Sequence, residues 1–140
     1  MTPIEKYRMV EQELARAKVE ITIRDSFPED VQRVLSCLHE HFLDESFDVN
    51  AIIACSGARK ASIYARFRYH VGMSIREYLE DRRMEVAMRL LQYDAFKIYD
   101  IAFSVGYASY RTFERAFRRH VGCSPRMHRE KMSRENDGRK

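Results

Sequence analysis

Two stretches of the chain, FRYHVGMSI at residues 67–75 and FRRHVGCSP at residues 117–125, are identical at six of nine positions and lie fifty residues apart. The match continues upstream, because an apolar residue, Ile63 or Phe113, precedes the first phenylalanine of each copy by four positions. A solenoid needs roughly three or more repeats. The sequence therefore indicates two copies of a small structural unit.

The second copy has the pattern of a helix, a turn and a second, basic helix. Its first helix places apolar residues on one face at helical spacing, at Ile98, Ile101, Ala102 and Val105. Gly106 then ends this helix, since glycine adopts a positive φ without steric cost. The next helix turns Phe113, Ala116 and Phe117 inward and presents Arg111, Arg115, Arg118 and Arg119 outward. This order is typical of the helix-turn-helix, and the first copy repeats it from about Val49 to Gly72, with Gly57 at the turn.

The remaining segments are also predicted to be helical. Ser74 and Glu77 form a capping box, and apolar residues follow at helical spacing to about Tyr93, which predicts one long linker helix. Few glycines and prolines interrupt the chain, so we predict an all-α fold of two homeodomain-like helix-turn-helix subdomains joined by that helix. The predicted parts are an N-terminal helical extension (1–28), the first unit (29–73), the linker helix (74–93), the second unit (94–130) and a flexible basic tail (131–140).

The charge is divided unevenly along the chain. Residues 1–55 carry six Lys and Arg against eleven Asp and Glu, a net charge of −5, whereas residues 56–140 carry nineteen against ten, a net charge of +9. A basic half favours a surface for a polyanion, although an ordinary solvated surface has the same composition. Charge alone leaves both interpretations open.

Several other classes of protein are disfavoured. The chain has no signal-peptide core and no apolar run of the ~20 residues that cross a bilayer, so we expect a cytoplasmic location and no membrane contact. Cys37, Cys55 and Cys123 lie far apart, which argues against a disulfide framework or a zinc site. No phosphate-binding glycine loop, metal-ligand spacing or activated nucleophile is present, so we expect no enzyme, no metal and no cofactor.

A short heptad stripe lies within residues 3–24. It consists of Tyr7, Val10, Leu14, Ala17 and Ile21. We expect a helix that either packs on the domain or pairs with a second copy of the chain in a homodimer; a frayed leader is the alternative.

Residues 83–129 resemble the signature of the AraC/XylS family of bacterial transcription regulators, and a weaker resemblance extends over about 29–130. Three motifs carry it: Arg83-Met84-x-x-Ala87-x-x-Leu90-Leu91, Ile98-x-x-Ile101-Ala102-x-x-Val105-Gly106-Tyr107, and Phe113-x-Arg115-Ala116-Phe117-Arg118-x-x-x-Gly122-x-Ser124-Pro125. The chain departs from the family pattern at Ile53, Arg59, Ala65 and His128. The resemblance implies a sequence-specific regulator of double-stranded DNA, more often an activator that recruits RNA polymerase. A protein-interaction module derived from a helix-turn-helix domain is the alternative.

The helix-turn-helix pattern and the resemblance together predict which residues touch DNA. Residues near the start of each recognition helix reach base edges in the major groove. The expected base contacts are Tyr110, Arg111, Glu114 and Arg115 in the second unit, and Lys60, Ala61, Ser62, Tyr64 and Ala65 in the first. The expected phosphate contacts are Arg59, Arg66, Arg68, Arg118 and Arg119. Since Ala61 and Ala65 are small, we expect the second unit to read more of the base sequence than the first.

Overall fold

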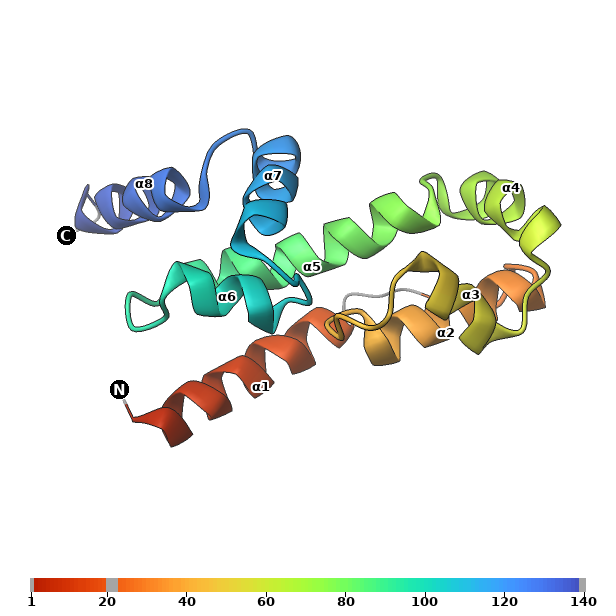
Figure 1. The fold of residues 1–140 in the computed structure, drawn as a ribbon, viewed down its shortest axis with the longest axis horizontal. Coiled ribbons are helices and arrows are strands. Elements are labelled where there is room, and N and C mark those ends of the chain that lie inside the picture. Colours follow the sequence, from red (N-terminus) through yellow and green to blue (C-terminus); the bar gives the residue numbers. More distant parts are fainter. Residues whose placement is uncertain (1, 20–22, 139–140) are drawn as a thin grey trace.

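The computed structural model describes residues 2–19 and 23–138, and within these ranges all regular structure is helical. The predicted all-α fold is therefore confirmed (Figure 1). The helices are α1 (Pro3–Val19), α2 (Glu29–His41), α3 (Val49–Ser56), α4 (Lys60–Val71), α5 (Ile75–Leu91), α6 (Ile98–Ser104), α7 (Tyr110–Val121) and α8 (Pro125–Gly138).

The first helix-turn-helix unit consists of α2, α3 and α4. The apolar stripe of α2 is fully buried, at Val31, Val34, Leu35 and Leu38. It packs against α3 and α4, whose Ile52, Ile63 and Phe67 are also fully buried. The Asp48 carboxylate starts α3 by accepting a hydrogen bond from the Ala51 amide at 2.9 Å.

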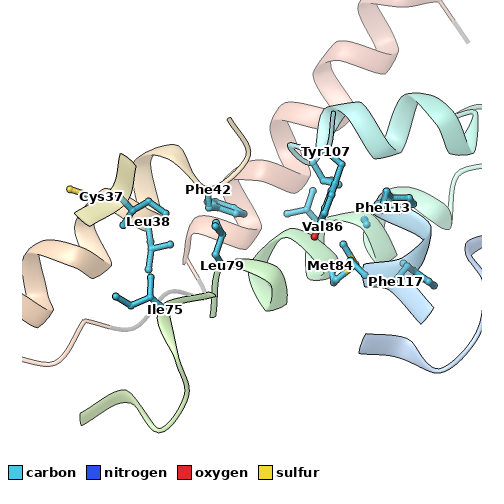
Figure 2. Close-up of a cluster of buried hydrophobic side chains, with 14 of the residues drawn as sticks. Cys37, Leu38, Phe42, Ile75, Leu79, Met84, Val86, Tyr107, Phe113 and Phe117 are labelled. Carbon is cyan, nitrogen blue, oxygen red and sulfur yellow. The ribbon is translucent and has the colours of Figure 1, made fainter. Parts of the chain in front are cut away.

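Helix α5 is the spine of the molecule and packs against α1, α3, α4, α6, α7 and α8. Its predicted capping box is present: the Ser74 hydroxyl accepts from the Glu77 amide at 3.1 Å, and the Glu77 carboxylate accepts from the Ser74 amide at 3.4 Å. Figure 2 shows Leu79, Met84 and Val86 of α5 between the buried side chains of the two units. The two units therefore share one continuous core.

The second unit consists of α6 and α7, followed by α8. Phe113, Ala116 and Phe117 of α7 are buried, as the pattern predicted. Helix α8 continues to Gly138, whereas a flexible tail was predicted for residues 131–140. This stretch has little apolar periodicity to indicate a helix, but Met132 packs against the core and Arg129 donates hydrogen bonds to the carbonyls of Leu91 and Tyr93 at 3.0 and 3.1 Å.

Helix α1 packs on α5, and Figure 1 shows it on the side of α5 opposite α7. Its Glu13 side chain is buried, accepts from the Tyr93 hydroxyl at 3.1 Å and lies 3.7 Å from the Arg89 guanidinium. Of the predicted heptad stripe, Val10 is half-buried against the core. The Ile21 position and the side chains of Tyr7, Leu14 and Ala17 lie outside what the structure describes. No helix in the described part of the chain is long and apolar enough to cross a membrane.

Candidate nucleic-acid interface

The two recognition helices, α4 and α7, border one groove whose floor is formed by α5. The groove has a volume of about 610 Å³. Tyr64 of α4 lines one wall, and Thr112, Arg115 and Arg119 of α7 line the other. The floor is formed in part by Arg76, Leu79, Glu80 and Arg83 of α5. A single surface of the protein therefore includes side chains from both helices that were predicted to touch DNA.

The two helices face this groove with different flanks. Tyr64 of α4 is equivalent in the repeat to Glu114 of α7, which does not line the groove. Conversely, Arg119 of α7 lines the groove, whereas Tyr69, its equivalent in α4, does not. Two units related by a two-fold axis would meet through the same flank. The opposite flanks indicate a tandem, head-to-tail arrangement of the two units.

The predicted base-contact residues of α7 separate into two pairs. Arg111 and Arg115 are exposed and form no ion pair or hydrogen bond with any residue that the structure describes. Tyr110 is half-buried, and its ring lies 4.5 Å from the ring of Tyr99. Glu114 is also half-buried and accepts a hydrogen bond from Arg118 at 3.0 Å. Two arginines in the first half of the helix are thus available to a ligand without breaking an existing contact.

In α4, all of the predicted base-contact residues lie outside the core. Lys60, Ala61, Ser62, Tyr64 and Ala65 are exposed, because Ile63 and Phe67 take the buried positions. The same outer face carries Tyr69, which is 83% exposed and was not predicted from the sequence. Its only signal in the sequence is that it occupies the repeat position of Arg119.

Four of the five predicted phosphate contacts form ion pairs within the protein. Arg66 donates to both carboxylate oxygens of Asp30, at 2.8 and 3.2 Å, and this contact holds the pKa of Asp30 below its ordinary value. Arg68 lies 3.6 Å from Glu77, Arg118 pairs with Glu114, and Arg119 pairs with Glu80. Arg59 is exposed at the start of α4 and has no ion pair with a described residue. The sequence could not reveal two of these pairs, Arg66–Asp30 and Arg119–Glu80, because their partners are 36 and 39 positions apart in the chain.

Arg83 of α5 joins the two units and was predicted only as part of a helix motif. Its buried guanidinium donates to the carbonyls of Phe42, Asp44 and Phe47 at 2.6, 3.1 and 3.2 Å. It also lies 5.5 Å from the centre of the Tyr107 ring, within range of a cation–π contact. One side chain therefore ties the α2–α3 turn of the first unit to the α6–α7 turn of the second.

A close backbone approach surrounds Arg83. Gly106 has φ +94°, and a Cβ atom built there would lie 3.0 Å from Arg83 Nε and 3.1 Å from the carbonyl oxygen of Leu43. The turn glycine predicted from the sequence is thus required for two reasons: its backbone is left-handed, and there is no room for a side chain. The charged residue within the apolar pattern of α5 was the signal for this junction.

A family profile described as a helix-turn-helix domain matches residues 53–131, which is more than half of the chain. The chain belongs to the AraC/XylS family of transcription regulators. The AraC/XylS resemblance seen in the sequence motifs is confirmed, and the chain is a DNA-binding transcription regulator of this family.

Relatives and solved structures agree with this assignment. The chain is 29% identical to the regulatory protein SoxS of Salmonella typhimurium over 102 residues, which are 73% of this chain and 94% of SoxS. It is 32% identical to the probable transcription factor PqrA of Proteus vulgaris over 87 residues, which are 62% of this chain and 71% of PqrA. The fold is similar to the C-terminal domain of AraT, a response regulator from Geobacillus stearothermophilus, with a TM-score of 0.71 at 24% identity, covering 76% of this chain and 88% of that domain.

Proposed function

We propose that this AraC/XylS regulator binds an asymmetric site on double-stranded DNA with α4 and α7 in two successive major grooves. The observation that carries the proposal is the tandem arrangement of two recognition helices whose exposed flanks border one groove. A recognition helix fits the major groove of B-DNA. Because the outer residues of the two units differ, the two halves of the site differ in sequence. Because the units are in tandem, both halves are read in the same direction along the DNA.

The length of the linker helix favours bent DNA. Helix α5 has 17 residues and is therefore about 25 Å long, at about 1.5 Å per residue. Successive major grooves on one face of straight B-DNA are about 34 Å apart. The proposed complex includes a bend that brings the two grooves closer together, at a cost that depends on the DNA sequence between them.

Within the proposed complex, α7 reads more of the base sequence than α4. Arg111 and Arg115 each bind a guanine through its O6 and N7 atoms, and Glu114 accepts from a cytosine amine after releasing Arg118. In α4, Ala61 and Ala65 contact thymine methyl groups or read the shape of the groove, together with Lys60, Ser62 and Tyr64. Phosphate contacts come from Arg59, Arg66, Arg68, Arg118 and Arg119.

The regulator acts in the cytoplasm of a bacterial cell, on the nucleoid, and activates transcription by contacting RNA polymerase. The relative named the F1 operon positive regulatory protein, from Yersinia pestis, supports activation; it is 27% identical over 99 residues, which are 71% of this chain and 33% of that protein. A homodimer through residues 3–24 remains part of the proposal. The face of α1 that includes Glu13 is already used on α5, so pairing would use the opposite face. Equilibrium sedimentation tests it, and a monomer at tens of micromolar (about the range of a weak coiled coil) contradicts it.

The test of the proposed function is selection of random duplexes of about 30 bp at near-physiological salt. A bipartite motif with two elements about one helical turn apart is the expected result. A single element means that one unit reads bases, and no enrichment favours the alternative function, a protein-interaction module.

A pair of variants then connects the selected site to named residues. Replacing Arg111 and Arg115 together by alanine should abolish specific binding, since each bidentate contact with guanine is worth about 1–3 kcal/mol. The matched control replaces Arg8 of α1 and Arg134 of α8 by alanine, because these arginines are exposed and lie outside the groove. Equal losses in the two double variants would show that only total charge matters and would contradict base reading by α7.

A further inference from the structure

Three carboxylates on one face of α5 meet basic residues of both recognition helices. Glu80 and Asp81 follow Glu77 by three and four positions, so both are neighbours of Glu77 on the helix surface. Glu77 lies 3.6 Å from Arg68 of α4. Glu80 pairs with Arg119 of α7, and Asp81 lies 2.9 Å from the imidazole of His120 in the same helix. The linker helix therefore holds basic side chains from both units.

Glu80 has the most unusual position of the three. Its side chain is 17% exposed and lies on the floor of the groove between α4 and α7, beside Arg76, Arg115 and Arg119. In the proposed complex this groove faces the phosphate backbone between the two major grooves. A carboxylate there repels phosphate unless a cation neutralises it. Arg119 supplies that cation, and its side chain is 62% exposed, so it has room to turn outward.

We propose that Glu80 is a specificity-determining residue, because it withholds Arg119 from DNA until α7 is seated in its own site. The inference rests on the proposed function. Phosphate contacts provide nearly all of the affinity for non-specific DNA, whereas base contacts distinguish one sequence from another. When Arg111 and Arg115 bind their bases, α7 is held in one position and a phosphate stays close enough to compete with Glu80 for Arg119. On other sequences these two arginines have no bases that hold α7, and Arg119 stays with Glu80.

This mechanism predicts a particular change in salt dependence. One additional phosphate contact changes the slope of log affinity against log salt by about −0.9 on duplex DNA, which corresponds to a gain of about three- to tenfold near 0.1 M salt. Glu80→Gln frees Arg119 on every sequence. It should therefore tighten binding to a scrambled duplex by about three- to tenfold and tighten binding to the selected site much less.

The experiment measures fluorescence anisotropy with the selected duplex and a scrambled duplex of equal length, from about 50 to 200 mM salt. The variants are E80Q, R119Q and the double variant E80Q/R119Q. The control is E85Q, which removes the same charge from the same helix, where Glu85 pairs with Arg89 outside the groove. We expect E80Q alone to steepen the slope on scrambled DNA, and R119Q to cancel that gain in the double variant. By itself R119Q should weaken binding to both duplexes, because Glu80 loses its cation, and more so on the selected duplex, where a phosphate contact is also lost.

Three results would overturn the inference while leaving the proposed function intact. E80Q and E85Q could give the same gain, which would mean a general charge effect. The gain of E80Q could persist in the double variant, which would mean that Arg119 is not the residue released. E80Q could weaken binding to both duplexes, which would mean that Glu80 positions Arg119 for its phosphate. If the wild-type protein binds the two duplexes equally well, the proposed function itself fails. This measurement needs no variant, so the two failures are distinguishable.

Discussion

Substitution of Gly106 by alanine should destabilise the fold much more than the same substitution at Gly122. The two glycines have nearly the same backbone, with φ +94° and +96°. They differ in surroundings: a Cβ at Gly106 would lie 3.0 Å from Arg83 Nε and 3.1 Å from the Leu43 carbonyl oxygen, whereas a Cβ at Gly122 meets nothing within 4 Å. The pair of variants thus separates the cost of the left-handed backbone from the cost of the crowding.

The magnitudes follow from the contacts. A left-handed backbone costs a residue with a Cβ roughly 1–2 kcal/mol. The lower conformational entropy of alanine in the unfolded chain offsets about 0.4–1 kcal/mol of this. Gly122→Ala should therefore lower the free energy of unfolding by about 1 kcal/mol. At Gly106 the Arg83 guanidinium must also move, and each hydrogen bond that it loses to a carbonyl costs about 1.5–3 kcal/mol. Gly106→Ala should lower the free energy of unfolding by about 3 kcal/mol or more.

Urea unfolding followed by circular dichroism at the helical band measures both free energies. At roughly 3–4 °C per kcal/mol for a domain of this size, the melting temperature should fall by about 10 °C for Gly106→Ala and about 3 °C for Gly122→Ala. Equal losses in the two variants would refute the reasoning, because they would show that the junction around Arg83 yields to an added methyl group without losing its hydrogen bonds.

Three further predictions concern single side chains. Burial and the neighbouring Cys55 thiol raise the pKa of Cys37 to about 12. A thiol reagent at mildly basic pH should therefore modify Cys55 and Cys123 first and Cys37 only after unfolding. Rapid reaction of all three cysteines would contradict this. Burial lowers the pKa of His128 from 6.5, so the unfolded state binds the proton more readily and the free energy of unfolding should fall as the pH drops below that value. Urea unfolding of the wild type at several pH values below 6.5 should show this fall, and His128→Phe should lack it. Ser74→Ala removes the capping box of α5 and should lower the free energy of unfolding by about 1 kcal/mol, and an unchanged urea midpoint would mean that the cap contributes nothing.

The sequence by itself determined the order of the helices and their buried faces. Helical periodicity and capping are local, so the patterns around Phe67 and Phe117 and the serine at position 74 were sufficient to place the recognition helices and the start of α5. The repeat also identified the outer faces, since whatever is opposite Phe67 and Phe117 must face solvent. The tail predicted to be flexible, residues 131–140, differed from that prediction: it is helical as far as Gly138, because Arg129 and Met132 anchor the helix to the rest of the domain.

Only the tertiary structure decided which charged residues are available to a ligand. Arg66 and Arg115 are both exposed arginines on recognition helices, but Arg66 is bound by Asp30, which is 36 positions earlier in the chain, while Arg115 has no such partner among the described residues. Likewise, Arg119 pairs with Glu80, which is 39 positions earlier in the chain, and Arg83 of α5 donates to the carbonyl of Phe42 in the first unit. A single sequence contains the charges but not the distances between them, and Coulomb and hydrogen-bond energies depend on those distances.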